Sequence, residues 1–407
     1  MAESANVRRR SHLEVPTLRQ KKPLAVRLLK AMNLPLLFVL ALLVGYGLVV
    51  LYSAVYGRTD YSFSRQAIGV LVGVAALALV AAFDYQKAAN WVLPLLIVSV
   101  ALNLLPLVPG IGQTVNGARS WIVLFGQQIQ PSEFSKVTII MLMAALVNAN
   151  QGRLKELRHY LKCLGIMLIP VVTIFLQPDM GTGMVFFVIG LVILFVGGAS
   201  RRYLIITLLV LAALIVLAFN IDPLLDKAFG HDVFLKQYQK DRLLVFINPS
   251  LDPQGLGYNL EQAKIAISTG GFAGKGFLQG TQYSQGFLPE APTDFIFCVL
   301  AEQFGFLGSA LLLLLYGLLL ALALRVAMKA DALGGLIVAG AMGMWVFQIV
   351  ENIGMTLGMM PITGIPLPFV SYGSSFMIVN FMVVGLIISV HAHKPEKDAH
   401  RLGYLPK

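Results

Sequence analysis

The chain has 407 residues, of which 57% are hydrophobic and only 13% are charged, with a formal net charge of +11. A soluble domain would carry about 25% charged residues, so this composition excludes an ordinary soluble fold. The two cysteines, Cys163 and Cys298, lie in apolar runs and are too few for a disulfide framework. The sequence therefore predicts an all-α polytopic membrane protein.

Ten hydrophobic runs approach or exceed the ~20 residues that a helix needs to cross a bilayer. In chain order, we expect spans at roughly 34–55, 66–83, 90–106, 132–148, 163–176, 183–199, 203–220, 294–324, 332–354 and 374–391. The eighth run is longer than a bilayer requires. Its helix is therefore expected to tilt or to project beyond the membrane.

Lysine and arginine residues concentrate at the two ends of the chain and in alternate connections between the spans. The positive-inside rule then predicts that both termini are cytoplasmic. We expect a basic tail at 1–33, a transmembrane domain at 34–391 and a second basic tail at 392–407. The stretch RRRSHLEVPTLRQKK in the first tail fits contact with anionic lipid headgroups, and nucleic-acid binding is a weaker alternative.

Two connections on the predicted outer side, 107–131 and 221–293, are too long to be simple turns. Long loops in compact proteins are usually functional. The second contains two amphipathic stretches, VFLKQYQKDRLLVF and YNLEQAKIAI, which we expect to lie at the membrane interface with the apolar face down. Breaks rich in glycine and proline, QPDMGTG and MPITGIPLPFVSYGSS, fall on the same side. The polar chemistry is thus predicted to gather at the outer surface.

Ionisable residues inside a span cost at least ~2.5–3.5 kcal/mol on insertion scales, so each one needs an explanation. Glu133 and Lys136 can pair on one helix face, either to neutralise each other or to serve a site. Glu302 follows Asp294 by a little over two helical turns, so both could line one crevice, while a structural role for Glu302 is the other interpretation. Glu351 is the remaining acid, in the ninth span.

The chain carries neither a P-loop nor a Gly-x-Ser-x-Gly motif, and its six histidines show no metal-ligand spacing. Seven strings instead resemble, in order, the motifs of the SEDS proteins, the RodA and FtsW cell-wall polymerases. These strings are GARSWI, QPSEFSK, QPDMGTG, DPQGLGY, FLPEAPTDFIF, ENIGM and PLPFVSYGSS. The stretch GKGFLQGTQ looks more like the RodA branch than FtsW. Pro292, Ser374 and Ser135 depart from the family pattern, in which His, Gly and Ala are usual at these positions.

The resemblance implies about ten transmembrane helices with a large extracytoplasmic loop between the seventh and eighth. It implies a peptidoglycan glycosyltransferase that polymerises lipid II at the outer face of the bacterial cytoplasmic membrane, in cell elongation. A membrane-anchored class B penicillin-binding protein, a transpeptidase, is the implied partner. The family also implies a divalent cation, Mg²⁺ or Mn²⁺, although no ligand set is evident in the sequence. The alternative is a lipid II flippase, which would place its polar groups near the midplane.

Asp294, in the TDFIF string, is the residue that the resemblance implies is essential for polymerisation. Glycan polymerisation needs a base to remove the proton from a sugar hydroxyl, and such a base contributes roughly 10²–10⁴-fold. Asp294 suits this role, and the alternative is a simple helix cap worth about 1 kcal/mol. Glu290 lies four residues earlier and could assist a cation or the acceptor sugar, or only face solvent.

The other candidate substrate-binding residues come from the first long connection and the fourth span. Arg119 and Lys136 are the cations best placed to bind a pyrophosphate leaving group, because an Arg fork in particular suits phosphate oxygens. The alternatives are headgroup contact for Arg119 and the ion pair with Glu133 for Lys136. The resemblance marks Trp121 as functionally sensitive, and it could stack on a sugar or anchor at the membrane interface.

Overall fold

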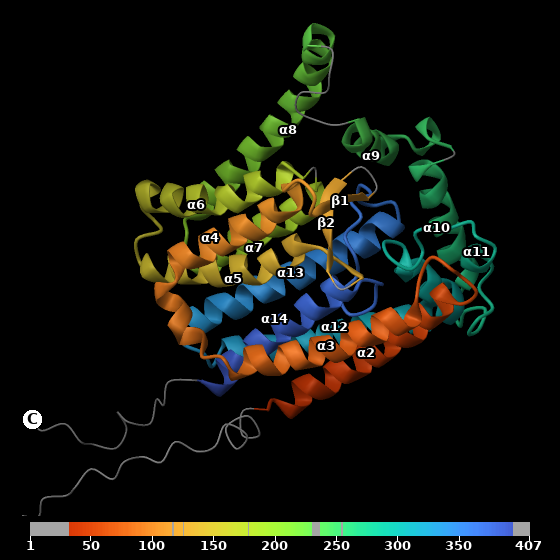
Figure 1. Cartoon of the computed structure of the whole chain (residues 1–407), viewed down its shortest axis with the longest axis horizontal. Coiled ribbons are helices and arrows are strands. Elements are labelled where there is room, and N and C mark those ends of the chain that lie inside the picture. Colours follow the sequence, from red (N-terminus) through yellow and green to blue (C-terminus); the bar gives the residue numbers. More distant parts are fainter. Residues whose placement is uncertain are drawn as a thin grey trace, which may run out of the picture.

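The computed structural model describes residues 32–115, 118–124, 126–177, 179–229, 237–253 and 255–393. Apart from their innermost residues, the two basic tails lie outside the described residues. The described chain is a bundle of long helices with short strands and helices gathered at one end, as Figure 1 shows.

Ten apolar helices make up most of the described part of the chain. They are α2 (Leu34–Val55), α3 (Phe63–Ala82), α4 (Val92–Leu104), α5 (Pro131–Ala149), α6 (Leu157–Phe175), α7 (Met180–Val196), α8 (Arg201–Phe229), α12 (Ile296–Ala327), α13 (Ala332–Thr356) and α14 (Ser374–Ala392). Each overlaps one of the ten expected spans. Eight are long and apolar enough to cross a membrane, and the other two, α4 and α7, are shorter apolar helices. The prediction of an all-α polytopic membrane protein is confirmed.

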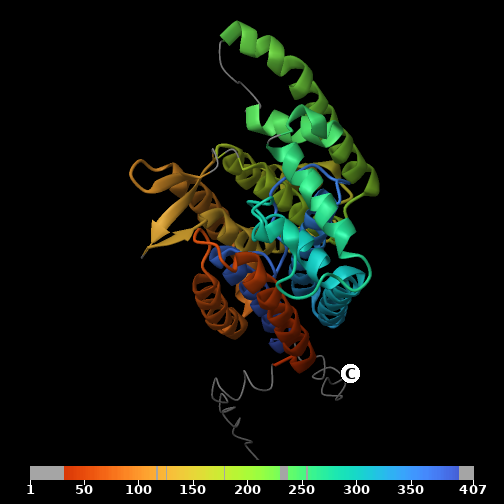
Figure 2. The same ribbon diagram turned by 90° about the vertical axis from the view of Figure 1, so that its right-hand side faces the viewer.

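Within the described residues, the connections hold nine shorter elements. Three are 3₁₀ helices: η1 (Tyr85–Asn90), η2 (Leu105–Leu107) and η3 (Pro249–Leu251). Three are α-helices: α9 (Gln237–Ile247), α10 (Leu256–Gly270) and α11 (Thr281–Ser284). Three are strands: β1 (Gly112–Val115), β2 (Ala118–Leu124) and β3 (Gln127–Ile129). The three strands and α9, α10 and α11 lie at one end of the bundle, here called the loop end (Figure 1). The start of α2 and the end of α14 lie at the opposite end, here called the tail end (Figures 1 and 2).

The centre of the bundle is built from α5 and α14. In the most apolar window of each helix, 78% of the residues are buried inside the protein, against 61% for α13. Around them, α3 packs on α14, α4 packs on α5, and α7 packs on α13. By contrast, no residue of the corresponding window of α8 is buried, and α8 stands away from the bundle in both views (Figures 1 and 2). An ion pair of 2.7 Å between Lys240 on α9 and Asp222 ties the two helices together.

The connection at 107–131 folds into an antiparallel sheet in the order β1-β2-β3. Trp121 on β2 lies opposite Gln113 on β1, and Ile122 lies opposite Ile129 on β3. The sequence analysis marked this connection as too long for a turn but did not predict its strands.

The two amphipathic stretches of the second long connection form α9 and α10, although Phe234 of the first stretch lies outside the described residues. Helix α10 packs against α12 and buries Leu260, Ala263 and Ala266, whereas the side chain of Ile265 is 41% exposed. The expectation that this helix rests its apolar face on the membrane is therefore wrong for Leu260, because the protein itself covers that face.

Helix α12 is broken at Gly305, whose φ of 62° lies in the left-handed region. A loop inserts beside the break and satisfies the freed backbone groups. The amides of Lys275 and Gly276 donate to the carbonyls of Glu302 and Gln303, and the amide of Phe306 donates to Gly271. Irregular backbone at membrane depth requires this kind of internal partner. The eighth span is therefore longer than a bilayer requires because α12 consists of a short helical piece before Gly305 and a longer piece after it.

Candidate active site

A cavity of about 490 Å³ opens at the loop end. Its wall is assembled from segments far apart in the sequence: the start of α3, the sheet, the starts of α5 and α7, α9, the turn before α12, the 363–366 segment and the start of α14. The charged residues of the wall are Asp60, Arg65, Glu133, Lys136, Asp179, Arg242, Glu290 and Asp294. Of the six residues that the sequence analysis assigned to the site, the structure brings together five, Trp121, Glu133, Lys136, Glu290 and Asp294.

Asp294 belongs to the turn that precedes α12, and it is not the cap of that helix. The N-cap residue is Phe295, and no side chain caps the helix there. Instead, the backbone amides of Thr293 and Asp294 donate hydrogen bonds to the backbone carbonyl of Glu290. Among the described residues, no hydrogen bond or ion pair engages the carboxylate of Asp294, which faces the cavity. The turn is therefore held by backbone hydrogen bonds, and the Asp294 carboxylate faces the cavity without stabilising the turn.

Two other segments hold the Asp294 turn in place. The side-chain amide of Asn352 on α13 donates to the carbonyl of Asp294 and to that of Ile365, each at 2.8 Å. The hydroxyl of Ser371 donates to the carbonyl of Thr293 at 2.6 Å, and the amide of Tyr372 donates to that of Pro292. Residues of the strings ENIGM and PLPFVSYGSS therefore hold the backbone of the TDFIF string in place through hydrogen bonds.

Glu290 lies beside Asp294 and accepts hydrogen bonds from Tyr61 at 3.2 Å and Thr293 at 2.9 Å, both on the same carboxylate oxygen. Burial raises the pKa of Asp294 to about 6, the negative charge of Glu290 adds to that rise, and the Arg242 guanidinium opposes it. Burial and the Glu290 carboxylate likewise hold the pKa of Tyr61 above its usual range. Asp294 therefore titrates nearer to neutral pH than an exposed aspartate does.

Glu133 and Lys136 form the predicted ion pair in the first turns of α5, where the Lys136 ammonium lies 2.6 Å from the Glu133 carboxylate. The two residues are only 4% and 2% exposed, yet both line the cavity. The ammonium also lies 5.3 Å from the centroid of the Phe376 ring. The second oxygen of Glu133 has no hydrogen-bond partner among the described residues. The ion pair is thus almost fully buried, but both residues form part of the cavity wall, where a bound ligand could contact them.

Arg242 on α9 is a cavity residue that sequence reasoning missed. Its guanidinium donates a hydrogen bond to the carbonyl of Thr363. Gly364 lies between Arg242 and Asp294, because an added Cβ on that glycine would meet atoms of both side chains. The available signal was a basic residue in an amphipathic stretch of a long loop, but nothing in the sequence links this stretch to the 363–366 segment.

Asp179 was also missed, although QPDMGTG was recognised as a break between helices. It caps α7 by accepting from the amide of Thr182 at 3.0 Å and from its hydroxyl at 2.8 Å. The side-chain amide of Gln130 donates to the same carboxylate at 3.0 Å. Asp179 thereby joins the starts of α5 and α7 at the wall of the cavity.

Trp121 and Arg119 lie on the same strand but have different surroundings. Trp121 lines the cavity, whereas Arg119 does not. The guanidinium of Arg119 instead donates to the carbonyl of Val108 at 3.2 Å. Among the described residues, the arginines that line the cavity are Arg65 and Arg242. The structure therefore separates Arg119 from the other candidate binding residues.

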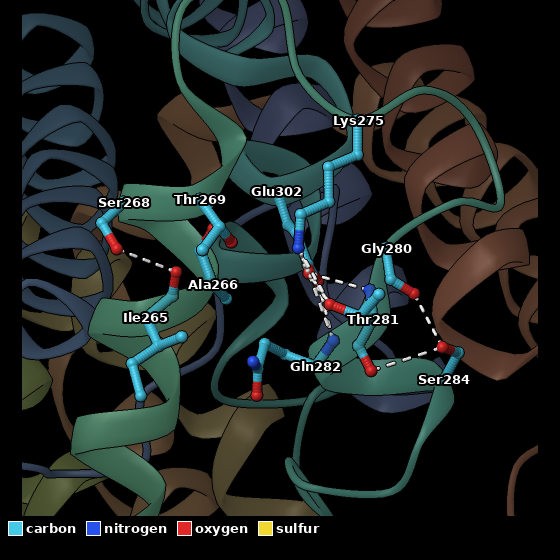
Figure 3. Close-up of polar contacts among 10 residues, drawn as sticks. All are labelled: Ile265, Ala266, Ser268, Thr269, Lys275, Gly280, Thr281, Gln282, Ser284 and Glu302. Carbon is cyan, nitrogen blue, oxygen red and sulfur yellow. Dashed lines mark hydrogen bonds and ion pairs between the residues drawn. The ribbon is translucent and has the colours of Figure 1, made fainter.

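Glu302 is fully buried and does not line the cavity. Figure 3 shows its carboxylate turned toward Lys275, Thr281 and Gln282. One of its oxygens accepts from the Lys275 ammonium at 2.7 Å, from the Thr281 amide at 2.8 Å and from the Thr281 hydroxyl at 3.0 Å. Of the two interpretations left open for Glu302, the structural one holds. Because α12 begins after Asp294 and breaks after Glu302, the two side chains do not share a helix face.

The donor set of the cavity bears on the divalent cation that the resemblance implies. Among the described residues, no group of three or more His, Cys, Asp or Glu side chains could hold a metal ion. Mg²⁺, however, is commonly held by one or two carboxylates together with substrate phosphate oxygens. Among the described residues, the carboxylates that line the cavity would meet that requirement only together with substrate phosphate oxygens, and a cation held in this way would neutralise charge on a bound pyrophosphate.

Fold and cavity together define a multi-pass membrane protein with a charged chamber at one end of its helix bundle. The model of the Cell cycle protein family, FtsW/RodA/SpoVE, matches residues 33–396. Peptidoglycan glycosyltransferase MrdB of Escherichia coli (strain K12) is 36% identical over 361 residues, which cover 88% of this chain and 93% of the relative. Stage V sporulation protein E of Bacillus subtilis (strain 168) is 35% identical over 367 residues, covering 88% and 96%.

Solved structures agree with these sequence matches. The crystal structure of the Thermus thermophilus rod shape determining protein RodA gives a TM-score of 0.62 at 28% identity, covering 88% of this chain and 95% of that chain. A chain from a structure described as showing structural coordination of polymerization and crosslinking by a peptidoglycan synthase complex gives 0.72 at 33% identity, covering 88% and 96%. The chain belongs to the SEDS family of FtsW, RodA and SpoVE proteins. Several relatives are named peptidoglycan glycosyltransferases, which confirms the prediction of an enzyme of that class.

Proposed function

We propose that this protein polymerises lipid II into glycan strands, with Asp294 as the general base, in cell elongation. The observation that carries the proposal is the unengaged carboxylate of Asp294 in a chamber that also holds Arg65, Lys136 and Arg242. A base and a set of cations are the two things that transfer of a sugar from a lipid pyrophosphate requires. Family membership supports the activity, and GKGFLQGTQ, which resembles the RodA branch, supports elongation.

In the proposed reaction, a hydroxyl oxygen of the acceptor sugar attacks the anomeric carbon of the donor sugar. Asp294 accepts the hydroxyl proton, the new glycosidic C–O bond forms, and the bond to the pyrophosphate breaks. The leaving lipid pyrophosphate keeps the bonding electrons, and Arg242 and Lys136 are positioned to bind its negative oxygens. Trp121 and Tyr61 line the same cavity, and we assign to them contact with the sugars.

We further propose that the loop end faces the outside of the cytoplasmic membrane and that both termini are cytoplasmic, as the positive-inside rule indicates. The substrate headgroup would then enter the cavity while its lipid stays in the bilayer. The proposed partner is a membrane-anchored class B penicillin-binding protein. Its support is the likeness to a chain from a peptidoglycan synthase complex that coordinates polymerization and crosslinking.

The experiment that tests the activity is polymerisation of purified lipid II by the purified protein in detergent, with and without the partner. Glycan strands formed without a membrane are incompatible with a pure flippase. If lipid II is never polymerised under any partner condition, the proposed function is wrong.

The pH dependence should report the titration of Asp294. A base must be deprotonated, and the pKa of Asp294 is raised to about 6. We therefore expect the initial rate to fall as pH drops through about 6 and to level off above it. Replacing Glu290 with Gln removes a charge that raises this pKa, so the acid limb of the rate profile should move to lower pH. A midpoint that stays fixed or moves upward in Glu290→Gln would contradict the assignment.

Arg242→Gln should weaken lipid II binding more than Arg119→Gln. Loss of a hydrogen bond from a charged group costs about 1.5–3 kcal/mol, which corresponds to roughly 10–150-fold in apparent KM. Arg119 is the matched control, because it is an arginine of the loop end that does not line the cavity. Steady-state kinetics on lipid II measure both variants. An equal loss for Arg119→Gln would restore the binding role that the sequence analysis gave to Arg119.

A further inference from the structure

A second cavity, of about 200 Å³, lies at the tail end of the bundle, away from the chamber that holds Asp294. It is formed where the start of α2, the last turns of α12 and the end of α14 meet. The residues that line it are Asn33, Pro35, Leu322, Arg325, Val326, Lys329 and His391. Nothing in the proposed reaction uses any of them.

The charged side chains described at this cavity are both positive. Arg325 and Lys329 are one helical turn apart, both are exposed, and no acidic side chain among the described residues lines the cavity. Among the described residues, neither makes an ion pair or a side-chain hydrogen bond. The nearby acid Asp331 is already engaged by the Tyr85 hydroxyl at 2.7 Å and the Gly334 amide at 2.9 Å. Cations stabilise a helix C-terminus, but that effect does not explain a hollow beside them.

The rest of the lining consists of the apolar residues Pro35, Leu322 and Val326 and the polar residues Asn33 and His391. Its volume is smaller than the ~300–1,000 Å³ of typical small-molecule pockets. On the same stretch of α12, Leu324 and Met328 are 47% and 69% exposed, as expected for a surface that faces acyl chains. A small cavity lined by two cations and three apolar side chains, at the end of helices that are apolar enough to cross a membrane, suits an amphiphile with a phosphate headgroup.

We propose that this cavity binds an anionic phospholipid, with its phosphate on Arg325 and Lys329 and its first methylene groups on Leu322 and Val326. Basic pockets between transmembrane helices are a known way of holding such headgroups. The bound lipid would join the start of α2 to the ends of α12 and α14. Its phosphate chemistry could also be met by free inorganic phosphate, so the test must separate the two sources. The site is independent of the proposed polymerase activity.

The test is native mass spectrometry of the full chain in detergent, titrated with dioleoyl phosphatidylglycerol. We expect the double variant Arg325→Gln/Lys329→Gln to bind the first lipid roughly 30-fold more weakly, because each cation near the surface contributes about tenfold or less. The control, Arg153→Gln/Lys155→Gln, removes the same two charges from the exposed connection between α5 and α6, which is also at the tail end. This control should retain wild-type affinity for the first lipid.

Three results would overturn the proposal. The first is an equal loss of affinity for phosphatidylglycerol in both double variants, which would mean that the positive surface charge attracts the lipid without a specific site. The second is equally tight binding of dioleoyl phosphatidylcholine, which would mean that the site does not distinguish an anionic lipid from a zwitterionic one. The third is displacement of the lipid by inorganic phosphate at matched concentration, which would make free phosphate the ligand. Selective loss in Arg325→Gln/Lys329→Gln, with phosphatidylcholine and phosphate both ineffective, supports it.

Discussion

Asp294→Asn should lower the rate of lipid II polymerisation by roughly 10²–10⁴-fold, the contribution of a positioned general base. The amide keeps the shape of the side chain but cannot accept the hydroxyl proton. The turn that carries it should persist, because its hydrogen bonds to Asn352 and Ser371 involve the backbone and not the carboxylate. The measurement is the initial rate of glycan formation by purified protein, with substrate in excess of KM.

The control for this variant is Glu261→Gln, which makes the same carboxylate-to-amide change at an exposed position of α10 outside the cavity. It should polymerise at the wild-type rate and melt at the wild-type temperature. If Asp294→Asn makes glycan strands as fast as Glu261→Gln, the carboxylate of Asp294 is not the base.

The second large effect is expected from the buried pair of Glu133 and Lys136. Lys136→Met leaves the Glu133 carboxylate buried without its partner, a change that typically costs about 3–5 kcal/mol of folding stability. The double variant Glu133→Gln/Lys136→Met removes both charges and should recover most of that loss. Thermal unfolding in detergent measures stability, and polymerisation of lipid II measures activity in the same samples.

The double variant separates the two interpretations that spacing alone left open. If Lys136 binds the leaving pyrophosphate, stability returns but activity stays low. Recovery of both stability and activity would show that the pair only neutralises itself. A double variant as unstable as Lys136→Met would instead indicate that the packing of Lys136 on the Phe376 ring matters more than its charge.

The ten spans could be predicted because each is a run of apolar residues, and eight of the helices also have the length that crossing a bilayer requires. Their ends were less certain, and for a physical reason. Helix α6 begins at Leu157, before the predicted start at 163, because Arg158, His159 and Lys162 interrupt the apolar signal but not the helix. Helix α8 likewise continues past the predicted end at 220, through Asp222. Charged residues interrupt the apolar run from which a span is predicted. The helix itself continues through them until the backbone geometry changes or a capping residue ends it.

The site was predictable in part. Asp294, Glu290, Glu133 and Lys136 stand out as acids and a base at the edges of apolar runs, where their cost demands a reason. Arg242 and Asp179 did not stand out, because a cation in a loop and an aspartate at a helix start are ordinary in sequence. They reach the cavity only because α9 contacts Thr363 and the start of α7 meets Gln130. Such long-range contacts cannot be inferred from local spacing.

The break at Gly305 has a mechanical consequence for Asp294. The loop at 271–276 is fastened by hydrogen bonds to both sides of the break, to the carbonyls of Glu302 and Gln303 before it and from the amides of Phe306 and Leu307 after it. A helix that meets a thicker or thinner bilayer adjusts by changing its tilt. Because the loop holds both pieces of α12, we expect the turn that carries Asp294 to move with the later, longer piece when that piece changes its tilt.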